Sequence, residues 1–547
     1  MTITETRPDD LAPPPPTATP APAGSEPLPA TADHKRLGLL YLAGALLFLV
    51  IGGVVGQVLR GELADEGVSI VGGNYGRLFS LHATVSALLF LGPAWIGLAT
   101  YVVPLQIGAG RLALPRMHAF SAWLYLCGGG LLVAAYLLGP PVGLGIADAR
   151  PMVALEGGAT RANALAVTSM ALVAVAMVLA SVSLAVTVLK LRTPGLTLRR
   201  LPMFAWSTLV TSVATLVATP VFLGGLLLLF IDQRLGAGFF APDNVGGQTV
   251  WQHTLWLFGR PEVFLLFVPG LGAACDIVAT HAHRPLLSLA AARAHIALFA
   301  VLAFGSWAAG TEVADAIVLP TYTPLTALVA APLAVLVLVW LGTVAKGRPG
   351  VRMHPSLTFV AGFVALCAVG ALHVLAAAAA GVEGAAWTTG HLHTVAFGAP
   401  TPLLAGAVHH WAPKLFGRAL SPALGRVAFL GLFGGFLLMG LGSYLAGYDG
   451  APNHVRDFDF STSTSTYGLL AAVGGLVTLL GALALVVDVA RALAGRGTAS
   501  TADDPYGGLT LEWATSSPPP AQGFDAVPEV RSAHPLLDLR SSESAGG

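Results

Sequence analysis

Two histidines separated by one residue, His391 and His393, lie in the apolar segment 387–411, within the sequence Thr-Thr-Gly-His-Leu-His-Thr-Val. Two positions along an α-helix correspond to a rotation of about 200°, so the two imidazoles point to opposite sides of the helix. They cannot easily chelate one metal ion together, but each could ligate a separate one, such as the iron of a haem. The alternative is that both histidines only form hydrogen bonds with neighbouring helices.

A third histidine, His82, lies early in the apolar segment 78–106, in the sequence Phe-Ser-Leu-His-Ala-Thr-Val. Polar side chains are costly at membrane depth, and they mark candidate functional sites there. His82 and one histidine of the segment 387–411 could bind the same iron from opposite sides. That arrangement would give one six-coordinate electron-transfer haem and one five-coordinate haem with an open face.

The elements that position these histidines are predicted to be transmembrane helices. Of the 547 residues, 55% are hydrophobic and only 10% are charged, whereas a soluble domain has about a quarter of its residues charged. Lipid must therefore be the solvent for most of the surface. Lys and Arg total 28 and so do Asp and Glu, and no nucleic-acid partner is expected.

The predicted fold class is all-α, a polytopic membrane bundle of twelve transmembrane helices in residues 35–496. Each apolar segment is long enough to cross about 30 Å of hydrocarbon. Residues 1–34 and 497–547 are rich in Pro, Ser, Asp, Thr or Ala and are predicted to be disordered tails. The twelve segments are 37–59, 78–106, 118–140, 163–190, 204–231, 252–280, 292–316, 322–345, 356–380, 387–411, 424–447 and 466–490.

The distribution of basic residues predicts the orientation of the bundle. If the N-terminus is inside, the inner segments hold eighteen Lys and Arg residues, and the outer loops hold six. Such an excess on one side is typical of the cytoplasmic side of a membrane protein. We therefore expect an integral protein, in a bacterial plasma membrane, with both termini in the cytoplasm. The six outer residues are Arg60, Arg77, Arg150, Arg161, Arg234 and Arg456.

Several long motifs resemble those of haem–copper oxidase subunit I, the cytochrome c oxidase subunit I family. The segment 251–264, Trp-Gln-His-Thr-Leu-Trp-Leu-Phe-Gly-Arg-Pro-Glu-Val-Phe, is similar to the helix 6 signature of that family. The segment 101–109, Tyr-Val-Val-Pro-Leu-Gln-Ile-Gly-Ala, resembles the stretch after helix 2. Residues 390–393 match its His-x-His motif, and 411–414, Trp-Ala-Pro-Lys, match the end of helix 10.

The resemblance extends from about residue 37 to residue 490, and it implies a role for each matched histidine. It implies that His82 and His393 are the axial pair of a low-spin haem. It implies that His391 is the single proximal ligand of a high-spin haem. Two haems of unknown type are therefore expected.

The sequence departs from the family pattern at the copper site. The first copper-ligating histidine is replaced by Arg260, and the family's tyrosine by Phe264. The helix 7 histidine pair, expected after Trp307-Ala308, is replaced by Ala309 and Gly310. A guanidinium stays protonated and offers no lone pair to a metal. No bound copper is therefore expected.

Two charged residues of the same segment are candidate catalytic groups. Glu262 matches the internal glutamate of the family, although the usual acidic entrance of its proton route aligns with Arg111. Arg260 is expected to occupy the volume of the lost copper and to pair with Glu312, Asp315 or an anionic haem ligand. The alternative for Arg260 is a structural cap at the membrane surface. Whether Glu312 and Asp315 build a different metal site stays open.

Two classes of function follow. The first is a membrane oxidoreductase subunit that passes electrons from a low-spin haem to a high-spin haem, with normal oxygen reduction in doubt because the copper ligands are replaced. The second is a non-catalytic haem protein, namely a transmembrane electron carrier, a sensor of diatomic gases or an assembly partner of an oxidase. Further oxidase-type subunits are expected as partners, together with an electron donor such as cytochrome c or quinol.

Overall fold

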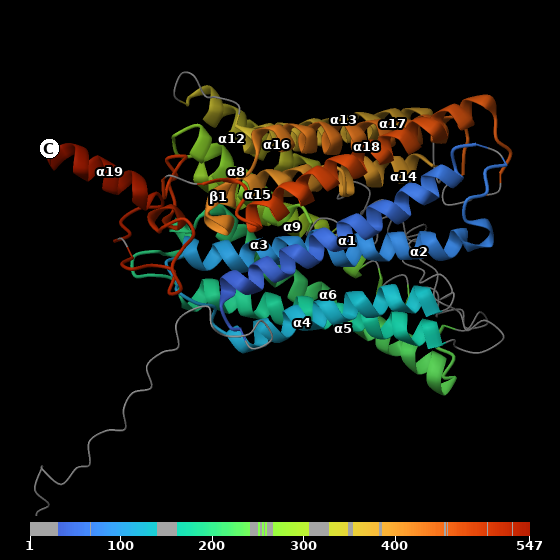
Figure 1. The fold of residues 1–547 in the computed structure, drawn as a ribbon, viewed down its shortest axis with the longest axis horizontal. Helices are drawn as coiled ribbons and strands as arrows, with labels where there is room; N and C mark the ends of the chain where they lie inside the picture. The colour runs from blue at the N-terminus through green and yellow to red at the C-terminus, as the bar shows by residue number, and fades with distance from the viewer. Residues whose placement is uncertain are drawn as a thin grey trace, which may run out of the picture.

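The computed structural model describes most of the chain as a bundle of long helices (Figure 1). The described residues are 31–65, 67–138, 161–240, 250–251, 254–255, 257–259, 266–305, 328–347, 354–381, 386–452, 456, 458–499, 502–527 and 529–546. Residues 1–30, most of the N-terminal tail predicted to be disordered, lie outside this set.

The first half of the bundle contains α1 (His34–Glu62), η3 (Gly72–Asn74), α2 (Tyr75–Val85), η4 (Ser86–Phe90), α3 (Leu91–Gln106), α4 (Pro115–Leu138), α5 (Arg161–Lys190), η5 (Leu198–Arg200), α6 (Met203–Leu235), α8 (Val268–His281) and α9 (Leu289–Gly305). The second half contains α12 (Ala330–Ala345), α13 (Pro355–Ala380), α14 (Trp387–His391), η6 (Leu392–Ala396), α15 (Pro400–Phe416), α16 (Pro422–Phe429), η7 (Leu430–Gly434), α17 (Gly435–Tyr448) and α18 (Thr462–Leu493). Two more helices, η8 (Leu511–Ala514) and α19 (Pro535–Gly546), follow a two-stranded sheet of β1 (Arg418–Ala419) and β2 (Thr498–Ala499). The strands are antiparallel, with Arg418 opposite Ala499.

Eight helical segments in the described part of the chain are long and apolar enough to cross a membrane. The prediction of an all-α membrane bundle is confirmed, but the count of twelve spans is not. The expected spans 252–280, 292–316, 322–345 and 387–411 contain the shorter helices α8, α9, α12 and α14 to α15. Residues outside the described set interrupt the first three of these spans. The fourth is divided by a widened turn after His391 and by Pro400, where α15 begins.

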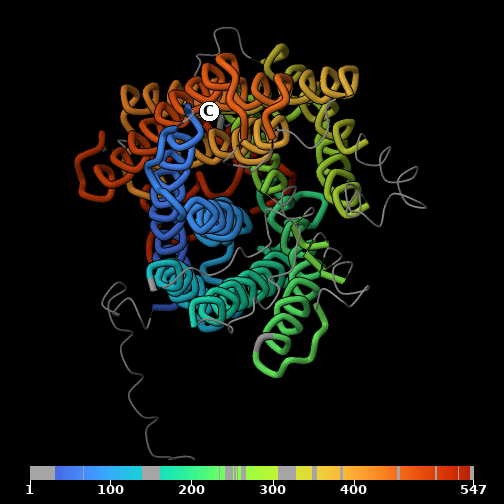
Figure 2. The backbone as a smooth tube through the Cα atoms, turned by 90° about the vertical axis from the view of Figure 1, so that its right-hand side faces the viewer, coloured from blue at the N-terminus to red at the C-terminus, as the bar shows by residue number. Residues whose placement is uncertain are grey.

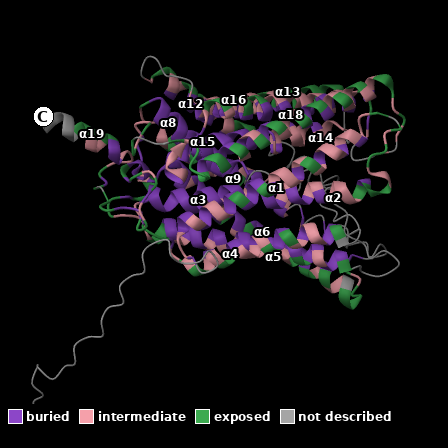
Figure 3. Ribbon diagram, in the orientation of Figure 1, coloured by how far each residue is buried: buried purple, intermediate pink, exposed green. Residues whose placement is uncertain are grey.

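The arrangement of the helices follows from which of their apolar faces are buried in the bundle and which are exposed. The continuous segment Gly72–Gln106 is the most buried span, and it runs through the middle of the bundle, between α4 to α6 on one side and α13 to α18 on the other (Figure 2). Large apolar side chains such as Leu137, Leu372 and Leu375 are exposed. The exposed residues of the helices lie mostly on the outside of the bundle (Figure 3). Such a surface is suited to lipid rather than to water.

The two ends of the bundle differ. We call the end where α1 begins the proximal end, and the end formed by residues 67–74 and 458–461 the distal end (Figure 1). The proximal end carries the C-terminal segment, which we define as residues 502–527 and 529–546. This segment contains η8 and α19.

The C-terminal segment is packed, which differs from the disordered tail expected for residues 497–547. Leu511 and Trp513 join the main hydrophobic core. The Glu512 carboxylate is fully buried and accepts hydrogen bonds from Gln106 Nε2 (3.1 Å) and Trp411 Nε1 (3.2 Å). The prediction of disorder used the average composition of the segment, which does not reveal these few apolar and hydrogen-bonding residues. They are enough to hold the segment against the bundle.

The burial of Glu512 predicts a pH-dependent attachment of this segment. Burial raises the pKa of the Glu512 carboxyl, and the hydrogen bond from Gln106 opposes that rise. A raised pKa means that the folded segment holds the proton more tightly than the unfolded one, so its stability is greatest at low pH and falls as the pH rises through the raised value. We expect limited proteolysis of the segment to accelerate with rising pH in the native protein and to stay constant in Glu512→Gln.

Glu529→Gln is the matched control for this prediction, because Glu529 is exposed and pairs with the exposed Arg531. Its proteolysis should change with pH as in the native protein. A pH-dependent cleavage rate that persists in Glu512→Gln would show that another group controls the attachment.

Candidate haem-binding site

His82 and His393 face each other across the bundle, although they are far apart in the sequence. His82 belongs to α2, and His393 belongs to the widened turn η6. Their ring centroids are 6.2 Å apart, with an angle of 24° between the ring planes. A metal-bound imidazole nitrogen lies about 2.0 Å from the metal and roughly 1.1 Å from its own ring centroid, so two imidazoles on opposite sides of one ion have centroids about 6 Å apart. The observed separation therefore fits one metal between the two rings.

The hydrogen bonds of the two rings select the same ring nitrogen for ligation. His82 Nδ1 is 2.8 Å from the carbonyl oxygen of Gly52, and His393 Nδ1 is 2.8 Å from that of Thr389. A carbonyl can only accept, so each Nδ1 carries the proton and each Nε2 carries the lone pair. Donation from the second nitrogen to a backbone carbonyl is the usual arrangement of a metal-binding histidine.

Two cavities meet at these histidines. The larger encloses about 290 Å³ and is lined mainly by apolar side chains, including Phe48, Phe90 and Met439. The smaller encloses about 120 Å³ and extends toward the distal end, past Tyr75. Both are lined by His82 and His393. A flat apolar macrocycle with a polar edge suits such a pair of connected cavities.

Glycine residues keep this space open. A Cβ atom added at Gly56 of α1 would lie 2.5 Å from Cε1 of His82. The carbonyl of Gly52, one turn earlier, is the acceptor for the same ring. A larger side chain at Gly56 would therefore displace the ring that Gly52 orients.

Arg60 also belongs to the site, which the sequence analysis missed because it assigned this residue to an outer loop. Arg60 Nη2 lies 2.8 Å from Nε2 of His393 and donates to its lone pair. Arg60 lines both cavities together with the two histidines. The position of a cationic residue at the end of the apolar run 37–59 was the signal in the sequence, because a charge at that depth requires a partner.

His391 lies on a different side of the same helix. Its ring stacks on Trp387, with centroids 5.4 Å apart and an interplanar angle of 6°. A Cβ atom at Gly370 of α13 would lie 3.8 Å from His391 Cε1. His393 instead faces α1 and α2, through Arg60 and His82. The expectation that the two histidines point to separate places agrees with these contacts.

A widened helical turn accompanies the histidines. The N–H of Phe397 donates to the carbonyl of Leu392 at 3.0 Å, a bond across five residues instead of four. The segment Leu392–Ala396 is a π-helical turn, and Ser86–Phe90, which follows His82, is another. Such turns contain an extra residue and are frequent at functional sites.

The other predicted site residues lie outside the described residues. They are Arg260 and Glu262, the possible partners Glu312 and Asp315, and the replaced copper-site positions Phe264, Ala309 and Gly310. Among the described residues, no group of three or more His, Cys, Asp or Glu side chains is arranged to hold a metal ion.

Comparisons with known proteins agree with this arrangement. Residues 36–477 match the family described as cytochrome c and quinol oxidase polypeptide I. The chain is 34% identical over 527 residues to a protein of Streptomyces avermitilis named as cytochrome c oxidase subunit 1-beta, covering 94% of this chain and 92% of the relative. It is 30% identical over 522 residues to cytochrome c oxidase subunit 1 of Corynebacterium efficiens, covering 93% and 88%.

A solved structure has the same fold. The chain superimposes on a chain of a haem–copper terminal oxidase dimer determined by cryo-electron microscopy, with a TM-score of 0.68 and 15% sequence identity. The match covers 85% of each chain. At this identity the likeness concerns the fold alone.

Proposed function

Because this chain belongs to the cytochrome c and quinol oxidase polypeptide I family of membrane electron-transport subunits, we propose that it binds two haems, with a specific ligand set. His82 and His393 are the axial pair of one haem. His391 is the single axial ligand of the other. Two haems held in this way would supply one-electron transfer from the first to the second.

The observation that carries this proposal is the geometry of His82 and His393. Their 6.2 Å separation fits one iron, both Nδ1–H groups are held by backbone carbonyls, and both rings line the same two cavities. Hydrogen bonds between histidines and neighbouring helices would explain the Nδ1 contacts alone. They would not explain why both rings line the same two cavities.

The residues of the chain then have distinct tasks. Haem iron with two axial ligands exchanges single electrons, and with one axial ligand it keeps a face open to a small molecule. Thr389 and Gly52 orient the two imidazoles through their carbonyls. The Arg60 guanidinium, which lies beside both rings, offers its donors to polar groups at the haem edge.

The second part of the proposal is that the chain binds no copper. Its motivation is the sequence at the copper-site positions, where Arg260, Ala309 and Gly310 replace three histidines and Phe264 replaces a tyrosine. Arg260 supplies a fixed positive charge in place of the ion, and Glu262 remains as the candidate proton-accepting group. Four-electron reduction of oxygen by the family's usual route is then not expected.

The same replacements favour a second candidate function. A high-spin haem without copper can bind a diatomic gas without turning it over, which suits a sensor, or it can relay electrons in a transmembrane carrier or an assembly partner. Ligand binding with oxygen consumption by the purified protein would support the oxidoreductase. Ligand binding without consumption would support the carrier or sensor.

The protein works with further oxidase subunits in the membrane, as its family implies. We propose cytochrome c or quinol as the electron donor. We also propose that the proximal end faces the cytoplasm of a bacterial cell, because the inner basic residues of the sequence analysis that the structure describes belong to that end.

Metal and haem quantification of the purified full-length protein tests the proposal. We expect two haems per chain, no copper, and optical spectra of one low-spin and one high-spin haem. Stoichiometric copper would contradict the copper-free site. A protein without haem would contradict the ligand assignment itself.

A further inference from the structure

One face of α18 is exposed along most of the helix and changes from polar to apolar. Its residues follow one another at alternating intervals of four and three, which places them on one side of the helix. Thr462 and Thr466 form the polar part, at the distal end. The apolar part follows, with every side chain at least 36% exposed, and it consists of Leu469, Val473, Leu476, Leu480, Leu483 and Val487.

A groove of about 520 Å³ opens where this face is polar. We call it the α18 groove. Asp65, which follows α1, lies in one wall, and the first two turns of α18 form the other. The two walls come close because residue 468 is a glycine, and a Cβ atom at Gly468 would collide with the carbonyl oxygen of Leu63. Leu469, the first residue of the apolar part, also lines the groove.

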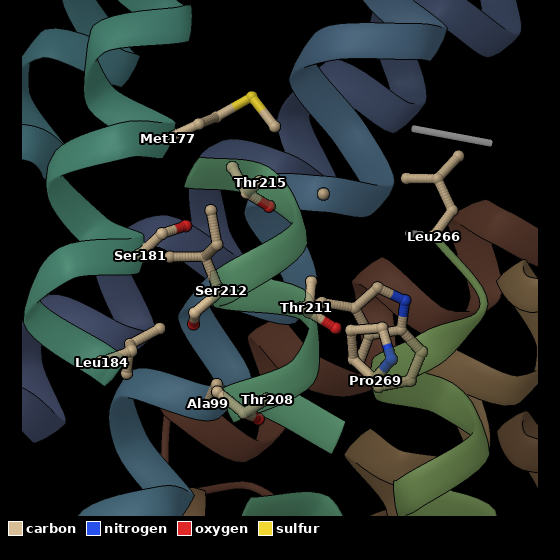
Figure 4. A pocket seen from close by; sticks show the side chains of 13 residues that line it. Ala99, Met177, Ser181, Leu184, Thr208, Thr211, Ser212, Thr215, Leu266 and Pro269 are labelled. Atoms are coloured by element: carbon tan, nitrogen blue, oxygen red, sulfur yellow. The ribbon is translucent and has the colours of Figure 1, made fainter. Parts of the chain in front are cut away.

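The size and position of the groove suit the headgroup of a phospholipid. The cavity between α5 and α6, next to Met177 and Thr215, has a volume of only about 40 Å³ (Figure 4), which is enough for a few waters alone. The α18 groove is much larger, and it continues into the exposed apolar part of the helix. A polar groove joined to an apolar face on a membrane helix matches the two polarities of a lipid, the headgroup and the acyl chains.

The groove presents hydrogen-bond acceptors. Ser465 Oγ donates its proton to Asp65 Oδ1 at 2.8 Å, and Thr466 Oγ1 donates to a carbonyl of its own helix at 2.8 Å. Ser461 Oγ donates to Asp449 Oδ2 at 2.9 Å. A hydroxyl has one proton to donate and two lone pairs, and an ionised carboxylate only accepts. These groups therefore turn lone pairs toward a ligand, which has to be a donor.

The charges at the groove are negative. Asp65 lines it, and Asp449 is bonded to a serine of its wall. Hydrogen bonds from two serine hydroxyls hold the pKa of the Asp449 carboxyl below its usual range, so this group stays ionised. Arg456, the described cation between α17 and α18, is turned toward Glu62, with Nε 2.9 Å from a carboxylate oxygen. An acidic headgroup would be repelled here, whereas an ammonium group, which has N–H donors and no acceptor, is complementary.

We infer that the α18 groove binds the primary ammonium headgroup of a phospholipid of the phosphatidylethanolamine class, with the acyl chains along the apolar part of the exposed face. The ammonium donates to Asp65 and to the hydroxyl oxygens of Ser465 and Thr466. Phosphatidylcholine carries the same charges, but its quaternary ammonium has no N–H to donate. Phosphatidylglycerol has no cation. The site is independent of the proposed haem function, because these three residues line neither histidine cavity.

Photoactivatable lipids test the site in the purified full-length protein, with all subunits that copurify, in nanodiscs of phosphatidylcholine. Three trace probes carry the same diazirine in an acyl chain and differ only in an ethanolamine, choline or glycerol headgroup. Mass spectrometry maps the label along the chain. We expect the ethanolamine probe to label peptides of residues 469–487 about fivefold more than the other two probes, which is the upper range for an exposed charge pair.

Variants locate the headgroup. Asp65→Asn keeps the size of the side chain and removes its charge, so it should lower labelling by the ethanolamine probe to the level of the choline probe. Thr466→Val removes one acceptor and should lower it about twofold. Asp525→Asn is the matched control, because Asp525 is an exposed carboxylate of the C-terminal segment that accepts a hydrogen bond from Gln522 Nε2 at 3.0 Å. It should label as the native protein does, and unchanged haem spectra verify the fold of each variant.

Equal labelling by the three probes, or labelling by the ethanolamine probe that persists in Asp65→Asn, would overturn the headgroup site. A preference for the glycerol probe would show that an anionic lipid binds there instead and would overturn it too. Peptides of α18 that no probe labels would mean that a partner subunit covers the exposed face, which also contradicts the inference. A native protein without haem would count only against the proposed function.

Discussion

Replacing His393 by alanine is expected to lower the haem content from two per chain to one and to remove the low-spin spectrum. His393 and His82 would hold one iron between them in our proposal, and removal of either lone pair would leave a single axial ligand in a cavity that is lined mainly by apolar side chains. An iron held by His393 Nε2 would replace the Arg60 guanidinium, which donates to that nitrogen in this structure. Haem extraction and low-temperature optical spectra of the purified variant measure the loss.

His295→Ala is the matched control for this experiment. His295 lies on α9, and its Nδ1 contacts the carbonyl of Ala291 in its own helix at 2.8 Å. Its haem content and spectra should equal those of the native protein. His391→Ala should instead remove the high-spin, ligand-binding haem and keep the low-spin one. A low-spin spectrum that survives in His393→Ala would refute the assignment of this pair.

Replacing Lys414 by methionine is expected to loosen the whole C-terminal segment. The side chain is fully buried at the end of α15. Its Nζ donates to the carbonyls of Asp503 (2.9 Å), Thr515 (2.5 Å) and Ser516 (3.4 Å), and it lies 5.4 Å above the Trp513 ring. Methionine leaves these buried carbonyls without a donor, which should cost about 3 kcal/mol, or roughly a hundredfold in the opening equilibrium.

Hydrogen–deuterium exchange measures this opening, because amide protection reports local unfolding free energies. Peptides from residues 502–527 should exchange about a hundredfold faster in Lys414→Met, while peptides of α1 and α5 stay unchanged. Lys346→Met is the control, since Lys346 is exposed at the end of α12. Native protection of the segment in Lys414→Met would mean that its apolar anchors alone hold it.

The helical membrane architecture was predictable because its signal is strong and local. A run of apolar residues such as 466–490 can satisfy its backbone in lipid only as a helix. The structure extends this run to Thr462–Leu493, with Ser461 as the N-cap. The break in segment 387–411 was less predictable, since a π-helical turn follows from hydrogen-bond geometry that hydrophobicity does not encode.

The histidines of the proposed haem site were predictable from residue type and spacing, whereas their hydrogen-bond partners were not. His391 and His393 stand out because polar residues are rare in apolar runs. The acceptors of His82 and His393 are the backbone carbonyls of Gly52 and Thr389, and any residue type could supply them. Glu512 was missed for a different reason. The C-terminal segment is rich in Ser and Pro, and its average composition does not reveal the few residues that pack it against the bundle.

Because the widened turns contain an extra residue, the histidine site depends on the number of residues in these turns as well as on their types. The turn Leu392–Ala396 holds one residue more than an ordinary α-helical turn. Loss of one residue of this turn other than His393 would let a regular α-helix form there, because the widened turn is what accommodates the extra residue. The helix beyond it would keep its direction, so Trp411 and Lys414 would still reach Glu512 and the carbonyls that they contact. A single-codon deletion would thus re-aim the His393 ring while it leaves the proximal end of the protein in place.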